Sequence, residues 1–248
     1  MLKKKLIVAA LAASFAVPAF AESTVSANVG FVSDYIFRGI TQTSHNPAVQ
    51  GGVDYTHDSG FYAGVWGSNV NWIADSGAVA SGSVTMELDT YAGFRNSIAD
   101  GIGYDVGYVR YNYLGDYTAA TGFAKADTHE LYGSLSYKFV SVKYSHSLGD
   151  FLTVIDGSGS NYLEVNASYT LEGTGVTLSA HAGKQTFKPA SADALYSYAD
   201  YKFGASKDIG GYVFGVAYSS TNAGSGWTYA TGGEWGKGVV AVTVSHAM

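Results

Sequence analysis

Few side chains in this 248-residue sequence have the types and the spacing that catalysis requires. Ser145, His146 and Ser147 would supply the nucleophile and the base of a serine hydrolase. That chemistry needs a serine on the same side of the chain as the histidine, and a polar group to orient the histidine. In an extended segment the residues two positions from His146 are Tyr144 and Leu148, so both serines face away from it. We interpret His146 as a histidine at the end of a strand.

The remaining titratable residues give weaker signals for chemistry. Glu87 and Asp89 share one face of an extended segment, as an acid/base pair of carboxylates could. His57 and Asp58 are neighbours in a turn and point apart, and His45 stands alone in a loop. The chain has no cysteine, and we expect no cofactor, no metal centre and no catalytic residues. Ordinary surface charge or a weak divalent-cation site could explain the loop aspartates Asp75, Asp116, Asp127, Asp150 and Asp156.

The elements that position these residues follow a period of two. In residues 161–171, apolar residues such as Leu163 and Val165 alternate with polar residues such as Glu164 and Asn166. This period indicates a β-strand with two different environments. Strands of about ten residues exceed the usual five or six, but they match the roughly 9–11 residues that a tilted strand needs to cross a bilayer.

The sequence predicts an all-β fold, a transmembrane up-and-down antiparallel β-barrel of about twelve strands, with ten or fourteen strands as alternatives. The expected strands cover residues 24–37, 48–57, 61–72, 84–95, 102–113, 129–139, 140–147, 161–171, 176–187, 198–207, 211–220 and 238–248. Short and long connections alternate between them, as they do in outer-membrane barrels, which have short periplasmic turns and longer external loops.

The first 21 residues have the pattern of a signal peptide that is removed on export. Three lysines, Lys3 to Lys5, precede a short apolar run, and Ala19-Phe20-Ala21 provides a cleavage site. We therefore expect a single barrel domain over residues 22–248. Removing those three lysines from the 14 basic residues leaves 11 against 20 acidic residues, so the exported chain is acidic and a poor candidate for nucleic-acid binding. The 20 tyrosines, 12 phenylalanines and four tryptophans suit the aromatic girdles of a membrane barrel.

The alternation assigns each side chain to the lipid or to the lumen, because a charge that faces lipid at mid-bilayer costs up to about 2–4 kcal/mol. The residues expected to line the lumen, and hence a pore, are Asp34, Asp54, Glu87, Asp89, Arg95, Glu130, Lys138, Lys143, Glu164, His181, Asp200 and Lys202. The segment 102–113 is ambiguous because Asp105 and Arg110 fall on opposite faces. We expect Asp105 near the periplasmic rim.

Several blocks of the chain resemble the TorF-type (Gcw_chp) porin family of proteobacterial outer-membrane β-barrels. The most distinctive block is "SDYIFRGI" (33–40), within "VGFVSDYIFRGITQTSHNPAVQGGVDY" (29–55). Others are "ELDTYAGFR" (87–95), "YDVGYVRYNYLG" (104–115) and "YLEVNASYTLEGTGVTLSAHAGKQ" (162–185). The resemblance covers nearly the whole exported chain and implies a single barrel in the outer membrane of a Gram-negative bacterium.

We expect a porin-like channel for passive diffusion of ions and small polar solutes. Twelve tilted strands give a cylinder about 24 Å across, and inward side chains leave on the order of 10 Å. The alternative is a closed structural or adhesive barrel whose lumen charges pair across the interior. An outer-membrane enzyme is a distant third. The expected partners are outer-membrane lipid and lipopolysaccharide, the barrel-assembly machinery and small polar solutes or cations; we expect a monomer.

Overall fold

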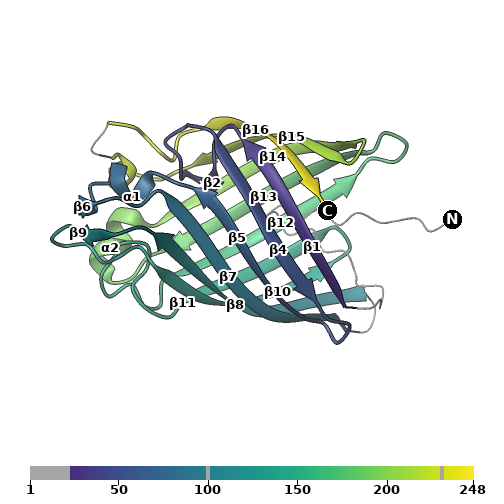
Figure 1. The fold of residues 1–248 in the computed structure, drawn as a ribbon, viewed down its shortest axis with the longest axis horizontal. Helices are drawn as coiled ribbons and strands as arrows, with labels where there is room; N and C mark the ends of the chain where they lie inside the picture. Colours follow the sequence, from purple (N-terminus) through teal and green to yellow (C-terminus); the bar gives the residue numbers. More distant parts are fainter. Residues whose placement is uncertain (1–22, 99–100, 230–231) are drawn as a thin grey trace.

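A closed barrel of twelve antiparallel strands forms the body of the molecule (Figure 1). The computed structural model describes residues 23–98, 101–229 and 232–248. The barrel strands are β1 (Thr24–Val32), β4 (Ala48–Thr56), β5 (Phe61–Asn69), β7 (Met86–Ser97), β8 (Ile102–Leu114), β10 (Thr128–Tyr137), β11 (Val140–Ser147), β12 (Asn161–Thr170), β13 (Val176–Thr186), β14 (Tyr198–Ile209), β15 (Tyr212–Thr221) and β16 (Val239–Ala247). Each strand pairs with the strand that follows it in the barrel, and β1 pairs with β16 to complete the wall. Ala27 and Met248 exchange backbone hydrogen bonds of 3.0 and 2.8 Å at this seam.

The smaller elements all lie in the long connections. They are β2 (Ile36–Phe37), β3 (Ile40–Thr41), α1 (Trp72–Asp75), β6 (Val79–Gly82), β9 (Tyr117–Ala119), α2 (Ala190–Tyr196) and η2 (Ser225–Trp227). Figure 1 shows α1, α2, β6 and β9 gathered at one end of the barrel, which we call the loop end, and the short turns at the opposite turn end. None of the described helices is long and apolar enough to cross a membrane.

The predicted fold is confirmed, including the number of strands. Ten of the twelve expected strands agree with the structure to within two residues at each end. The two exceptions both end early at the loop end. The expected strand 24–37 ends at Val32, and the expected strand 61–72 ends at Asn69, where the chain turns toward α1. The signal peptide expected over residues 1–21 lies outside the described residues.

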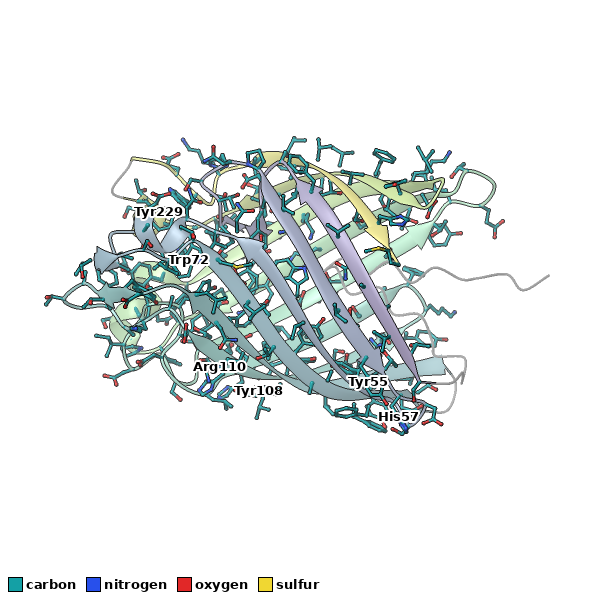
Figure 2. All side chains as sticks on the ribbon, viewed as in Figure 1. Tyr55, His57, Trp72, Tyr108, Arg110 and Tyr229 are labelled. Carbon is teal, nitrogen blue, oxygen red and sulfur yellow. The ribbon has the colours of Figure 1, made fainter. Side chains whose placement is uncertain are left out.

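The wall separates apolar from polar side chains as the alternation requires. Leu135 and Val240, both expected on the outside, are 56% and 58% exposed. Glu87 and Glu130, expected on the inside, are 1% and 0% exposed. At the loop end, aromatic side chains such as Trp72 and Tyr229 belong to one buried apolar cluster, whereas Tyr55 and His57 mark the turn end (Figure 2). The barrel therefore has an apolar outer surface and a charged interior.

Candidate functional site

The first long connection folds into the barrel as a hairpin. We call residues 33–47 the inner hairpin; within it β2 pairs with β3, and Arg38 and Gly39 form the turn. Both turn residues have positive φ angles, 47° and 80°. A side chain at Gly39 would collide with Thr221 and Asp200 on the barrel wall, so glycine is required both for the backbone angle and for the close approach.

Arg38 anchors the tip of the inner hairpin to the opposite wall. Its guanidinium donates hydrogen bonds to both carboxylate oxygens of Glu130 on β10, at 3.0 and 2.7 Å, and to Gln185 on β13 at 2.8 Å. It also stacks on the ring of Tyr162, 4.4 Å from the centroid. The hairpin leaves from β1, and β10 lies on the far side of the barrel from β1 in the strand order. The connection therefore crosses the whole lumen.

The base of the inner hairpin is held by a second set of polar contacts. Asp34 accepts hydrogen bonds from the hydroxyls of Thr41 and Thr43 and lies 2.7 Å from the imidazole of His45. Tyr35 packs edge-on against Trp66. Because Ile40 and Thr41 are 2% and 0% exposed, the hairpin is an interior element of the barrel and not a surface loop.

A histidine-centred network lies on the inner wall below the tip of the hairpin. His181 Nε2 is 2.8 Å from Asp200, and His181 Nδ1 is 2.7 Å from Asn166. The hydroxyl of Tyr162 donates to Asp200 at 2.8 Å, and the Glu164 carboxylate lies 3.6 Å from the imidazole. Both nitrogens of His181 are thus engaged by neighbouring side chains of the wall.

A third polar network lies toward the turn end. Tyr62 donates a 2.6 Å hydrogen bond to Asp105 and also contacts the hydroxyl of Tyr132. Arg95 stacks on Tyr62, and Lys143 stacks on Tyr132, with charge-to-centroid distances of 4.8 and 4.3 Å. In this network tyrosines therefore contact both the acidic and the basic side chains.

Two acidic residues beside the inner hairpin, Glu87 and Asp89, each have one carboxylate oxygen without a hydrogen-bond partner in the described chain. Tyr35 donates a 3.3 Å hydrogen bond to Glu87 Oε1. Within the described chain, Glu87 Oε2 and Asp89 Oδ1 are buried and accept no hydrogen bond. The described residues contain no group of three or more side chains that could hold a metal ion.

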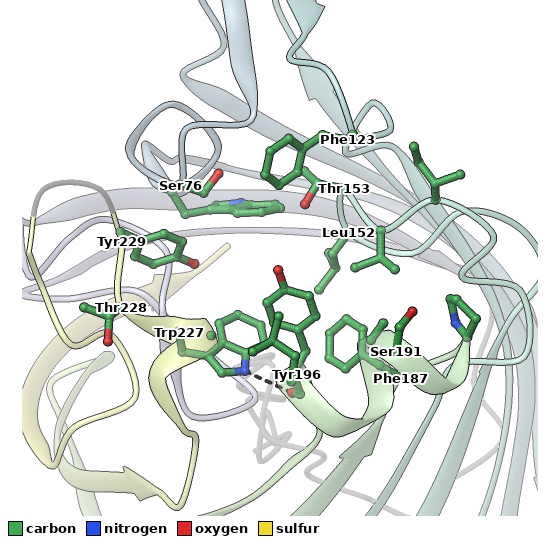
Figure 3. A pocket seen from close by; sticks show the side chains of 18 residues that line it. Ser76, Phe123, Leu152, Thr153, Phe187, Ser191, Tyr196, Trp227, Thr228 and Tyr229 are labelled. Carbon is green, nitrogen blue, oxygen red and sulfur yellow. Dashed lines mark hydrogen bonds between the residues drawn. The ribbon is translucent and has the colours of Figure 1, made fainter.

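Open space remains beside the inner hairpin and at the loop end. A cavity of about 290 Å³ lies between the hairpin and strands β1 and β14 to β16, and polar side chains such as Asp34 and Lys202 line it. A second cavity of about 470 Å³ lies at the loop end (Figure 3). We call it the loop-end cavity; Phe123, Tyr196 and Trp227 are among its lining residues.

Comparison with known proteins places the chain in a family. Residues 16–248 match the family model described as "Bacterial protein of unknown function (Gcw_chp)". The chain belongs to this family. No match was found among curated proteins.

The Gcw_chp barrel has the same fold as two solved porins. It aligns with the KdgM porin at a TM-score of 0.52 and 8% identity, over 90% of this chain and 97% of that one. It aligns with the NanC porin at a TM-score of 0.51 and 10% identity, over 90% and 98% of the two chains. A further match, at a TM-score of 0.51 and 7% identity over 91% and 97% of the chains, is the "KdgM porin in complex with disordered oligogalacturonate".

Ten of the residues predicted to line the lumen lie on barrel strands with their side chains on the inner side of the Gcw_chp wall. They are Asp54, Glu87, Asp89, Arg95, Glu130, Lys143, Glu164, His181, Asp200 and Lys202. Asp34 is also inside, but it belongs to the inner hairpin and not to a strand.

Lys138 is the correction to this set. It lies with Phe139 in the two-residue turn between β10 and β11, with a φ of 53°, and its side chain is exposed. The expected strand 129–139 ran two residues too far, because β10 ends at Tyr137. The alternation of inner and outer side chains applies only within a strand and cannot assign a face to Lys138. In the turn, the Lys138 side chain does not face the lumen.

The ambiguous charges on β8 are resolved by their neighbours. Asp105 faces the lumen, where it accepts the hydrogen bond from Tyr62. Arg110 lies on the outside toward the loop end, exposed and 3.6 Å from Asp127. Arg38 is an inner residue that the alternation of faces does not identify, whereas Gln185 lies on the same face of β13 as His181 but is not included in the predicted set. The sequence signal near Arg38 is the "SDYIFRGI" block, but the expected strands 24–37 and 48–57 place its Arg-Gly pair in a connection and not inside the barrel.

The residues considered for hydrolysis are not brought together. Ser145 and Ser147 are buried on the inside, whereas His146 lies on the other face beside Tyr144. His57 contacts Asp58 and Ser59 within the exposed turn between β4 and β5. Because Ser59 and Asp58 both contact the same nitrogen of His57, Nδ1, this turn does not have the serine–histidine–carboxylate order of a hydrolase triad.

Proposed function

We propose that this protein is an outer-membrane porin-like channel of the TorF type, through which ions and small polar solutes diffuse passively. The observation that carries the proposal is a closed twelve-strand wall that is apolar outside and charged inside. A closed barrel leaves no unpaired strand edge in lipid, so it can span a bilayer. The polar cavity beside the inner hairpin supports a water-filled path.

Several finer features complete the proposal. The chain is exported with residues 1–21 as a cleaved signal peptide, is inserted by the barrel-assembly machinery and functions as a monomer among outer-membrane lipid and lipopolysaccharide. The loop end faces outward from the cell. The inward acidic and basic side chains line the solute path, and the inner hairpin narrows it.

The inner hairpin also favours the second candidate function, a closed structural barrel. The expected opening of about 10 Å would be blocked wherever the hairpin crosses it. The two candidates differ in what a purified protein does in a bilayer. A porin conducts with its hairpin in place, whereas a closed barrel conducts only after the hairpin is removed.

Planar-bilayer recordings on two proteins test this difference. One is the wild type, and the other has residues 36–41 replaced by two glycines, which removes the hairpin tip and leaves the barrel strands intact. We expect small, stable steps of conductance from the wild type and steps several-fold larger from the shortened protein. A silent wild type with a conducting shortened protein supports the closed barrel. If both are silent although folded, the porin proposal is wrong.

A further inference from the structure

The loop-end cavity lies where five of the six long connections meet. Its lining comes from the connection with α1 (Trp72), from residues 122–123, from residues 152–155, from the connection with α2 (Tyr196) and from the connection with η2 (Trp227). The inner hairpin contributes none of the lining residues. The cavity therefore belongs to the loop end of the barrel and not to the interior beside the hairpin.

Aromatic and aliphatic side chains form most of the lining. Figure 3 shows Phe123, Tyr229 and Trp227 on different sides of the same space. Trp227 is held in place, because its indole Nε1 donates a 2.9 Å hydrogen bond to the carbonyl of Tyr196 and its ring packs edge-on against Tyr198. The cavity volume, about 470 Å³, is within the range of about 300–1,000 Å³ that is usual for small-molecule sites.

Among the described residues that line the cavity none has a charged side chain, and the polar side-chain groups are hydroxyls and the indole N–H groups of Trp72 and Trp227. The hydroxyl-bearing residues are Ser76, Thr153, Ser191, Tyr196, Thr228 and Tyr229. Within the described part of the chain, Ser76 bonds to the carbonyl of Ile73, but the other five hydroxyls make no hydrogen bond. Burial raises the pKa of Tyr229, so its hydroxyl remains a hydrogen-bond donor at neutral pH.

The floor of the cavity connects to the inner hairpin. Phe187 lines the cavity and packs edge-on against Phe151, with ring centroids 5.1 Å apart. The Arg38 guanidinium lies 5.9 Å from the centroid of the Phe151 ring. Two phenylalanine rings in contact thus link the lining of the cavity to the hairpin tip.

From these features we infer that the loop-end cavity is a binding site for a neutral, hydroxylated ring compound of the sugar class, which is held there before it passes the inner hairpin. Aromatic faces suit the apolar C–H face of a pyranose, and the free hydroxyls suit its polar edge. The absence of charged side chains from the lining disfavours a sugar acid, because a buried charge without a partner is costly. This inference rests on the proposed channel function, whose solute class it specifies.

Binding can be measured without any passage through the barrel. The full exported chain is purified in a detergent with no sugar headgroup, and maltose is titrated while tryptophan fluorescence is recorded. Two of the four tryptophans, Trp72 and Trp227, line the cavity and report on it. We expect a saturable change with maltose, and at least tenfold weaker binding of glucuronate.

Variants separate the chemistry of the site from a general loss of folding. Trp227→Ala should weaken maltose binding at least tenfold. The double variant Tyr196→Phe and Tyr229→Phe keeps both rings but removes two hydroxyls, so it should weaken maltose binding and leave binding of cyclohexanol unchanged. Tyr137→Phe, an exposed residue at the turn end, is the matched control and should bind maltose normally.

Three results would overturn the inference: no saturable maltose binding by folded protein, binding of cyclohexanol alone, or glucuronate binding as tight as that of maltose. The bilayer recordings separate this failure from failure of the channel proposal. A protein that conducts but does not bind maltose retains the channel function and loses the sugar site. A protein that binds maltose but never conducts loses the channel function.

Discussion

At the scale of single residues, Arg38 is the residue on which the position of the inner hairpin depends most. Its pair with Glu130 is buried, with side-chain exposures of 7% and 0%, and joins the hairpin tip to the far wall. Burial by itself lowers the pKa of Arg38, but the adjacent Glu130 carboxylate more than offsets this, and the net pKa is raised. Arg38 therefore stays charged at neutral pH.

Removing Arg38 leaves the Glu130 carboxylate buried without a counter-charge. We expect Arg38→Met to reduce the free energy of unfolding by roughly 3–5 kcal/mol. The double variant Arg38→Met with Glu130→Met should recover most of that loss, since both buried charges are then gone. Chemical unfolding followed by the gel mobility of unheated samples measures each value.

The control for this cycle is the exposed pair of Arg110 and Asp127, whose atoms are 3.6 Å apart. Exposed pairs contribute at most about 1 kcal/mol, so Arg110→Met should have little effect. Equal losses at Arg38 and Arg110 would mean that the hairpin is not anchored by its buried ion pair.

At the scale of elements, the strands were predictable because their signal is local. Every second residue of β12 must be apolar because one face of the strand contacts lipid. This alternation can be recognised within the ten consecutive residues of the strand. The inner hairpin gave no such signal. Asp34 continues the alternation of β1, so the sequence does not distinguish a strand position from a hairpin position there. Glu130, the partner of Arg38, is 92 residues away along the chain. Alternation reports which side of a strand is polar, but it does not report where the chain leaves the sheet.

The register of β12 can be tested with two substitutions at adjacent positions. Val165 lies on the outer face, so Val165→Arg should destabilise the barrel in lipid by roughly 2–4 kcal/mol near mid-bilayer. Asn166 lies inside, 2.9 Å from Glu164, which would partly neutralise an introduced arginine, so Asn166→Arg should cost less. Unfolding measured in lipid vesicles gives the stability loss of each variant. If Asn166→Arg costs more than Val165→Arg, the register of β12 differs from the structure by one residue.

At the scale of the whole molecule, closure of the sheet determines behaviour in detergent. A closed ladder of backbone hydrogen bonds has no free edge from which to unravel. We expect unheated protein to migrate faster on a gel than boiled protein. We also expect the protein to stay in the membrane fraction during alkaline extraction. A single mobility before and after boiling would contradict the closed barrel.

The charge balance of the interior gives a prediction about ions. The described inner residues carry eight acids, namely Asp34, Asp54, Glu87, Asp89, Asp105, Glu130, Glu164 and Asp200. The four inner bases, Arg38, Arg95, Lys143 and Lys202, leave a formal excess of four negative charges. A negative lumen attracts cations, most strongly at low salt, where the Debye length is about 30 Å at 0.01 M.

Reversal potentials across a KCl gradient should therefore show a preference for K⁺ over Cl⁻ that grows as the salt concentration falls. Neutralising Asp54 and Glu164 together, as Asp54→Asn and Glu164→Gln, should weaken the preference. Glu172→Gln, in the exposed turn between β12 and β13, is the control and should leave it unchanged. Selectivity for Cl⁻ in the wild type would show that the inner charges do not govern permeation.

The position of the inner hairpin in the chain constrains the order in which the barrel can assemble. The hairpin follows β1 directly, and β1 is also the strand that meets β16 to complete the wall. A sheet that is still incomplete can enclose the hairpin from the side, whereas a finished cylinder admits it only through its open loop end. Contacts such as that between Arg38 and Gln185, 147 residues apart, form slowly in isolation. If the incomplete sheet binds the hairpin early, β1 and β16 then pair with the hairpin already inside the barrel.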